Sequence, residues 1–345
     1  MRKILLALLL ACTMSVGAQI KKFDMLTVFE QRFDLTATKI NVDGQFCHVV
    51  VNATNDNRCV LIGKLEAMER SDDYKVIVDE ANGEANVSVT VSSAAKSSFA
   101  GELTLLVSPN AVVNIKTESG YVDIVDVKNA DITVKSNSGK LRTSGVDGKL
   151  NLATRSGEVT LKNMKGDFSV ETASGTITAN NMEGSINCES ISGLITVTNV
   201  NGSLKSKSTS GNQDINIVRG DLNLDVSSGS AKITDVEGVI KAKTYSGALS
   251  FFKVKCEMHI ESFKGQISGG KDITLTASSD FVSDQGKINM RLTNDKKELT
   301  FKLACTENKK ANLMAKGTTK QKKLNEGDGP IVITATTRSA SIVFQ

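Results

Sequence analysis

Apolar and polar residues alternate in short segments through the middle of the chain, and a glycine precedes each segment. Ile177 and Ala179 lie two and four positions after one such glycine, and Ile195 and Val197 lie two and four positions after another. Because successive side chains of a β-strand point to opposite sides, this pattern predicts short strands whose apolar residues face inward. The polar residues between them are expected to face solvent.

The glycines that precede these strands return every nine residues between positions 139 and 265. They are Gly139, Gly148, Gly157, Gly166, Gly175, Gly184, Gly193, Gly202, Gly211, Gly220, Gly229, Gly238, Gly247 and Gly265, with Cys256 at the one interruption. Two kinds of unit alternate, so the repeating coil comprises two units, about 18 residues. A short fixed period predicts a solenoid in which each coil buries its apolar residues against its neighbours. We therefore expect an all-β fold, a single-stranded parallel β-helix, with glycine at the corners because it accepts positive φ.

Three rows of polar residues recur at the interval of the coil. The first holds Asn163, Asn181, Asn199 and Asp235; the second holds Ser138, Ser156, Ser174, Ser192, Ser210, Ser228 and Ser246; the third holds Ser136, Thr154, Thr172, Ser190, Ser208, Thr244 and Ser262. Such rows are either a polar binding surface or corner residues whose side chains bond nearby backbone groups. We favour the second interpretation, in which these side chains are part of the fold.

One outward slot of the coil carries a row of charges: Glu171, Glu189, Lys207, Asp225, Lys243 and Glu261. From Glu189 onward the sign alternates from coil to coil. Stacked strands lie roughly 4.8 Å apart, so opposite charges on adjacent coils are expected to help fix the register, each pair contributing about 0.2–1 kcal/mol.

The interval between Pro109 and Pro330 contains no proline, which agrees with strands that are hydrogen-bonded along both edges.

The repeat fades toward both ends of the chain. We expect irregular N-terminal β coils and a cap over residues 19–101, the regular solenoid over 102–272, and C-terminal β coils with a lysine-rich loop, residues 309–323, over 273–345. Terminal coils must cover the open edge of the stack, which accounts for their irregularity. Within the N-terminal part, residues 60–70 are compatible with either a strand or a short helix.

Residues 1–18 are predicted to be a signal peptide, with two basic residues, a short apolar run and a small-residue cleavage site before Gln19. Its removal takes away two of the 42 basic residues and none of the 38 acidic ones, so the net charge falls from +4 to +2. This balance is too weak to indicate nucleic-acid binding. The apolar run is too short to span a membrane, and we expect no transmembrane helix. Cleavage before Cys12 with lipid anchoring there is a less favoured alternative.

The residues do not suggest a catalytic, cofactor or metal site. His48 and His259 have no nearby Cys, Asp or Glu at a metal-ligand spacing, and the chain has no tryptophan. Neither a Gly-x-Ser-x-Gly elbow nor a phosphate-binding loop occurs, and the corners lack the aspartates of calcium-binding β-rolls. The strongest hidden candidate is a C-terminal cluster that could fold over one face of the solenoid, formed by Asp280, Asp284, Lys287 and Arg291.

The mature chain keeps an odd number of cysteines: Cys47, Cys59, Cys188, Cys256 and Cys305. Cys188 falls in an inward slot and is expected in the core. Cys47 and Cys59 flank a predicted hairpin and would be able to form a disulfide in an oxidising compartment, although spacing alone leaves this open.

The segment that leads into the regular coils carries a resemblance to a known family. Residues 102–120 form a strand, a proline turn and a second strand that ends in Thr-Glu-Ser-Gly, and Ser-Gly coils follow. This arrangement resembles the bacterial putative-adhesin domains of unknown function, over roughly residues 35–345. The resemblance implies a right-handed β-solenoid on an exported protein, and it brings no catalytic residues.

Two classes of function follow from these patterns. The favoured one is an exported, non-catalytic β-solenoid, either an adhesin-like binding protein or a structural element of the cell envelope, located in the periplasm, on the outer surface or outside the cell. Its partners are unknown, with an envelope glycan or a protein surface as candidates. The alternatives are a glycan-active lyase or hydrolase, which usually needs clustered carboxylates and aromatic platforms, and an envelope-stress or sensing module. Ice binding is disfavoured because Asp214 and Lys232 interrupt the threonine column of Thr160, Thr178 and Thr196.

Overall fold

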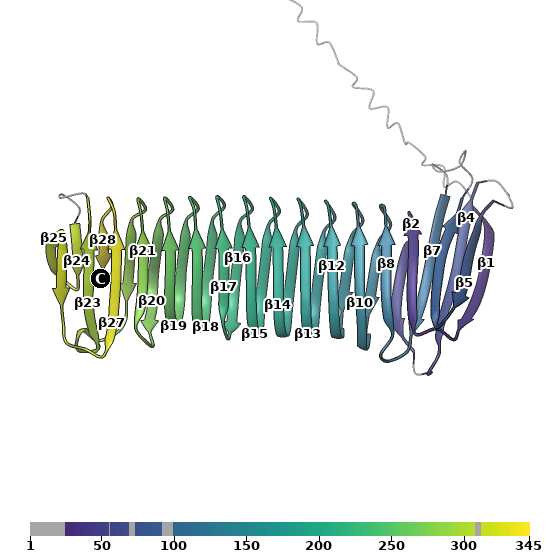
Figure 1. The fold of residues 1–345 in the computed structure, drawn as a ribbon, viewed down its shortest axis with the longest axis horizontal. Helices are drawn as coiled ribbons and strands as arrows, with labels where there is room; N and C mark the ends of the chain where they lie inside the picture. Colours follow the sequence, from purple (N-terminus) through teal and green to yellow (C-terminus); the bar gives the residue numbers. More distant parts are fainter. Residues whose placement is uncertain (1–24, 55, 69–72, 92–98, 308–311) are drawn as a thin grey trace, which may run out of the picture.

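The chain folds into a long rod in which β-coils are stacked side by side (Figure 1). The computed structural model describes residues 25–54, 56–68, 73–91, 99–307 and 312–345, so the predicted signal peptide and Cys12 lie outside the described residues. Strands β1 to β28 join in one hydrogen-bonded sheet, with a short 3-10 helix at Lys296–Glu298. The prediction of an all-β solenoid is confirmed, with about ten coils spaced by about 18 residues.

Each coil contributes a strand to each of two faces. The first face comprises β3 (His48–Ala53), β9 (Val122–Val125), β11 (Leu141–Ser144), the first halves of β13 (Val159–Thr172), β14 (Ile177–Ser190) and β15 (Ile195–Ser208), β16 (Gln213–Arg219), the first halves of β18 (Ala231–Thr244) and β19 (Leu249–Ser262), β20 (Ile267–Leu275), β22 (Ile288–Leu292), β28 (Ile342–Phe344) and β24 (Asn312–Ala315). The second face comprises β2 (Lys39–Gln45), β8 (Val112–Thr117), β10 (Lys128–Ser136), β12 (Asp147–Thr154), the second halves of β13, β14 and β15, β17 (Leu222–Val226), the second halves of β18 and β19, β21 (Ser279–Ser283), β27 (Ile331–Thr337) and β23 (Leu299–Cys305).

The coils pair residue for residue at the predicted interval. Ile177 is the Cα partner of Ile195 in the parallel pair β14–β15, and Val159 is the partner of Ile177 in β13–β14. Equivalent slots therefore stack directly on one another, and both predicted inward positions of each nine-residue unit are buried. A third inward slot was not predicted: Met164, Met182, Val200, Val218, Val236 and Val254 are also buried.

That third slot exists because the chain bends immediately before it. Asn163, Asn181, Asn199 and Asp235 have positive φ values of 53°, 58°, 59° and 56°. Asparagine tolerates this left-handed conformation better than most residues. The amide groups also stack, because Asn181 Nδ2 donates to Asn163 Oδ1 and Asn199 Nδ2 donates to Asn181 Oδ1, each at 2.9 Å. The row is part of the fold, as predicted, but its amides bond one another from coil to coil and not the backbone groups that were expected.

The Ser-Gly corner works differently from the prediction. Gly175 and its equivalents do not have positive φ; instead, a Cβ atom built on Gly175 would overlap the carbonyl oxygen of Gly157 in the preceding coil. Glycine is needed here because two backbones approach closely. Positive φ, as predicted, is found in the other glycine column, for example 129° at Gly166.

Ile217 occupies the asparagine-corner position of its coil with a φ of 59°. A β-branched residue is poorly suited to this conformation, which costs about 1–2 kcal/mol relative to an ordinary one. We therefore expect Ile217→Asn, which extends the amide ladder from Asn199, to raise the free energy of unfolding by about 1 kcal/mol in a denaturant titration. Ile217→Val is the control, because it keeps the strain and should give no gain. A lower stability for Ile217→Asn than for Ile217→Val would contradict this account.

Antiparallel strands close both ends of the rod (Figure 1). At the N-terminal end β4 (Cys59–Ala67) pairs with β1 (Leu26–Leu35) and β7 (Phe99–Val107), and β5 (Lys75–Ala81) pairs with β6 (Glu84–Thr90). At the C-terminal end β26 (Lys323–Glu326) pairs with β23, and β25 (Thr318–Gln321) pairs with β24. Thus residues 60–67 form a strand. Residues 312–321, predicted as part of a lysine-rich loop, form a hairpin, whereas residues 309–311 lie outside the described residues.

Cys47 and Cys59 are both buried and carry no disulfide. Burial raises the pKa of the Cys47 thiol to about 12, and it does the same for Cys188 and Cys256. These three thiols therefore stay protonated at neutral pH and act as small apolar side chains, as predicted for Cys188.

Candidate functional site

A groove runs along the second face of the rod, beside the Ser-Gly corners. We call it the axial groove. Its wall residues are Lys135, Ala153, Glu171, Glu189, Lys207, Asp225, Lys243, Glu261, Val282 and Thr336. Its corner residues, each two positions further along the chain, are Asn137, Arg155, Ala173, Ile191, Thr209, Ser227, Tyr245, Phe263, Asp284 and Arg338.

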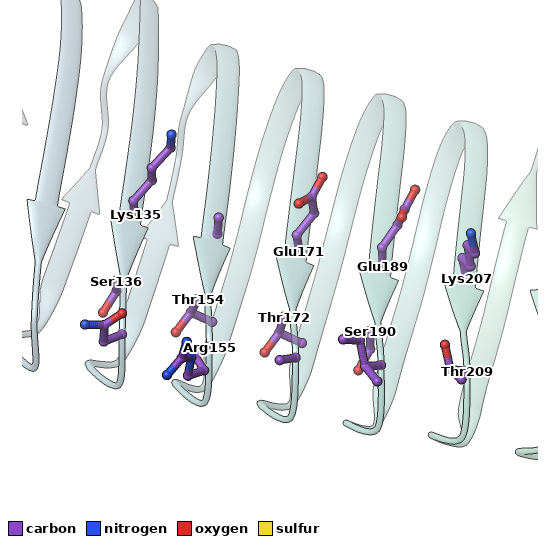
Figure 2. Close-up of a pocket in the computed structure, with 14 residues that line it drawn as sticks. Lys135, Ser136, Thr154, Arg155, Glu171, Thr172, Glu189, Ser190, Lys207 and Thr209 are labelled. Atoms are coloured by element: carbon purple, nitrogen blue, oxygen red, sulfur yellow. The ribbon is translucent and has the colours of Figure 1, made fainter.

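The axial groove has two segments, with volumes of about 490 Å³ and about 540 Å³. Figure 2 shows the first segment, where the long wall side chains of Glu171, Glu189 and Lys207 lie on successive coils, and Lys135 lies two coils before Glu171. The second segment begins on the next coil, because Lys207 of the first and Asp225 of the second are Cα partners. At about 4.8 Å per coil, the ten wall positions span roughly 43 Å along the rod.

Serine and threonine hydroxyls between the wall and the corner form the floor of the groove. The hydroxyl of Thr172 accepts a hydrogen bond from Gly175 N at 2.8 Å, and that of Ser190 accepts one from Gly193 N at 2.7 Å. In the outer serine row, Ser192 Oγ donates to the Ala173 carbonyl at 3.2 Å. Both rows thus bond the backbone of the corners, as predicted, and a ligand in the groove would meet mainly the wall and corner side chains.

The charges that line the axial groove are balanced. Five are basic (Lys135, Arg155, Lys207, Lys243 and Arg338) and five are acidic (Glu171, Glu189, Asp225, Glu261 and Asp284). The expected pairing between coils is present at Lys243 and Glu261, whose Nζ and Oε2 atoms lie 2.8 Å apart. This hydrogen bond and the charge of Glu261 raise the pKa of Lys243. Glu189 instead contacts Lys205, at 3.3 Å, in the neighbouring column.

An exposed aromatic pair lies in the second segment of the groove. The rings of Tyr245 and Phe263, on adjacent coils, are stacked with centroids 4.9 Å apart and planes 17° from parallel. Tyr245 is 56% exposed and Phe263 is 39% exposed. This pair was not predicted from the sequence, although Tyr245 and Phe263 occupy the same slot of successive coils.

The C-terminal cluster predicted from sequence does not assemble as one site. Asp284 bonds Arg338 in the groove, with Arg338 Nη2 2.7 Å from Asp284 Oδ2. Asp280 lies on β21 of the second face and bonds His259, whereas Arg291 lies on β22 of the first face. The structure therefore joins Asp284 to an arginine that the prediction did not include.

Both histidines lie between two carboxylates, which sequence reasoning also missed. Nδ1 of His259 bonds Asp280, and its Nε2 lies 2.8 Å from Glu257. The hydrogen bond with Asp280 is the main reason that the pKa of His259 is raised. His48 Nε2 lies 2.7 Å from Asp123 Oδ2. Each histidine and its aspartate lie on adjacent coils. The stretch of chain from His259 to Asp280 contains more residues than one regular coil. Within the described parts of the chain, no group of His, Cys, Asp and Glu could hold a metal ion.

In a comparison with protein families, residues 75–215 match the model of the Toastrack DUF4097 family. This part of the chain is similar to a Toastrack domain. The matched residues extend from β5 into the start of β16, and thus cover the first segment of the axial groove and precede the aromatic pair. The resemblance to adhesin-like domains of unknown function is confirmed.

Solved structures with some likeness to this chain are described as putative adhesins from Parabacteroides merdae and Parabacteroides distasonis. The first is 13% identical, with 70% of this chain and 96% of that chain covered and a TM-score of 0.28; the second is 13% identical, with 79% and 98% covered and a TM-score of 0.30. A third, described as a putative lipid binding protein from Parabacteroides distasonis, is 13% identical, with 92% and 96% covered and a TM-score of 0.26. A search of curated proteins finds no match. In the described part of the chain, no helix is long and apolar enough to cross a membrane.

Proposed function

We propose that this protein is an exported, non-catalytic binding protein whose axial groove holds an extended polymer chain of the cell envelope, in particular a glycan. The observation that carries the proposal is that two groove segments follow one another on adjacent coils, so that their wall residues occupy ten successive coil positions. A site that repeats one geometry along its length suits a ligand that also repeats. The predicted signal peptide supports an exported location, in the periplasm, on the outer surface or outside the cell.

The groove favours binding over catalysis. Glycoside hydrolysis uses two carboxyl groups on opposite sides of the scissile bond, one of them with a raised pKa in a protected setting. Here Glu171 and Glu189 occupy the same wall on adjacent coils, and neither is buried. The remaining acidic residues of the groove include two that are paired with basic partners, Glu261 with Lys243 and Asp284 with Arg338.

Obstruction of the groove tests the proposal. Ala173 is a small corner residue in the first segment, and Ala173→Arg should reduce binding to the insoluble fraction of the native cell envelope about tenfold or more in a pelleting assay. Ala248→Arg is the matched control, because Ala248 is equally half-buried but follows the corner on the way to the first face. Equal binding by the two variants would overturn the groove as the binding site. Release of soluble sugar products by the wild type would overturn the non-catalytic assignment.

A further inference from the structure

The Tyr245–Phe263 stack leaves one aromatic face open within the groove. Because the two rings are nearly parallel, Phe263 covers one face of Tyr245, and the opposite face points toward the preceding coil. The corner residues of the two preceding coils are Ser227 and Thr209, which have short side chains, and Tyr245 is 56% exposed. Ser227 lines the same groove segment as Tyr245. The open face of Tyr245 is therefore an accessible aromatic platform bordered by hydroxyl groups.

Charged groups that can bond hydroxyls flank this platform. Asp225 and Lys243 are the wall residues of the two coils that carry Ser227 and Tyr245, and they are Cα partners. Both side chains are exposed. Asp225 offers a hydrogen-bond acceptor, and the Lys243 ammonium, which already bonds Glu261, has further N–H groups that can donate. The charges of Asp225, Lys243 and Glu261 sum to −1, which disfavours an anionic ligand. This environment suits a neutral polyhydroxylated ring better than an anion.

We propose that the open face of Tyr245 binds a single neutral hexose ring, at the end or a branch of the glycan, with Asp225 and Lys243 bonding its hydroxyls. The inference rests on the proposed function and names the ligand class for one part of the groove. A pyranose ring has an apolar face of C–H groups that packs on an aromatic ring, and hydroxyls at its rim that bond polar side chains. The Tyr245 ring stands across the groove, since its neighbour in the stack lies on the next coil. A ring packed on it therefore also stands across the groove, as a terminal or branching sugar does.

Saturation-transfer NMR on the full mature chain tests this site with methyl glucoside and methyl glucuronide, which differ by a carboxylate. We expect a transfer signal for methyl glucoside and a several-fold weaker one for methyl glucuronide. Tyr245→Ala should reduce the affinity for methyl glucoside about tenfold to thirtyfold, and Tyr245→Phe should retain it. Tyr121→Ala is the matched control and should leave binding unchanged, because Tyr121 is 49% exposed and lies just before β9 of the first face, away from the groove.

Equal signals from wild type and Tyr245→Ala, or tighter binding of methyl glucuronide, would overturn the hexose site. Lack of any signal with methyl glucoside, methyl galactoside and methyl N-acetylglucosaminide would overturn it too. Those failures are distinguishable from failure of the proposed function, because Ala173 lies four coils from Tyr245. Envelope binding that Ala173→Arg abolishes would stand even if Tyr245 binds no sugar. Binding of an extended peptide or a lipid vesicle, lost in Tyr245→Ala while the glycosides give no signal, would assign the platform to that ligand and overturn the inference.

Discussion

Substitution of Gly175 by valine is expected to lower the free energy of unfolding by about 3 kcal/mol or more, because overpacking at a rigid contact is costly. The added Cβ would overlap the Gly157 carbonyl oxygen and come 2.7 Å from Thr172 Oγ1. The Gly157 carbonyl belongs to the backbone, so a change of side-chain rotamer cannot relieve this overlap. Relief requires the two coils to separate, which weakens the hydrogen bonds between them. Thermal and denaturant unfolding measure the loss.

Gly317→Val is the comparison that isolates this steric mechanism. Gly317 has a φ of 96° in the hairpin turn between β24 and β25, and an added Cβ there would meet no atom within 4 Å. Its substitution should cost only the conformational strain, about 1–2 kcal/mol. The sequence pattern alone suggests that Gly175, and not Gly317, has an unusual backbone conformation. That suggestion is wrong, because of the two only Gly317 has positive φ. Equal losses at Gly175 and Gly317 would contradict the close-approach explanation.

Truncation of Phe344 to alanine is expected to cost about 3–5 kcal/mol, the usual range for a buried phenylalanine. Phe344 is fully buried on β28, and its ring centroid lies 5.5 Å from that of Phe281 and 5.7 Å from that of Phe301. These three rings join strands of both faces at the C-terminal end. Because coils interact mainly with their neighbours, the damage should remain near that end. Hydrogen exchange should therefore show lost protection in β22 to β28 and near-normal protection in β11 to β15.

Phe252→Ala provides the control for loss of an aromatic side chain. Phe252 lies on the first half of β19 but is 36% exposed, so its truncation should cost less than about 1.5 kcal/mol. If Phe344→Ala lowered protection evenly along the rod, the nearest-neighbour description of its stability would be wrong. If Phe344→Ala lowered the free energy of unfolding no more than Phe252→Ala does, the aromatic cluster would not be what stabilises the C-terminal end.

The regular coils were predictable because their period is constant and their geometry has few choices. The alternation of apolar residues gave the inward slots, and the glycine period gave the register that joins Ile177 to Ile195. The third inward slot was missed because a left-handed residue such as Asn181 reverses the alternation that a straight strand would keep. The role of Gly175 was misjudged because sequence period reveals that glycine is required, but not whether φ or a neighbouring backbone requires it.

The axial groove was partly visible in the sequence. Its wall is the predicted row of alternating charges, yet the row was interpreted only as register control. Tyr245 and Phe263 are one coil apart, so their stacking followed from the same period that predicted the core. The contacts of Asp284 with Arg338 and of His259 with Asp280 were beyond prediction, because they cross coils where the spacing departs from the regular period.

The residue-for-residue pairing of the coils also determines how the rod can change in length. Removal or duplication of one whole coil between the two antiparallel ends would shorten or lengthen the molecule by about 4.8 Å and leave every other contact in place. Insertion of half a coil would keep the core apolar but exchange the two faces from that point onward, which would divide the groove. The number of coils therefore sets the length of the groove, and with it the length of ligand that the protein can hold.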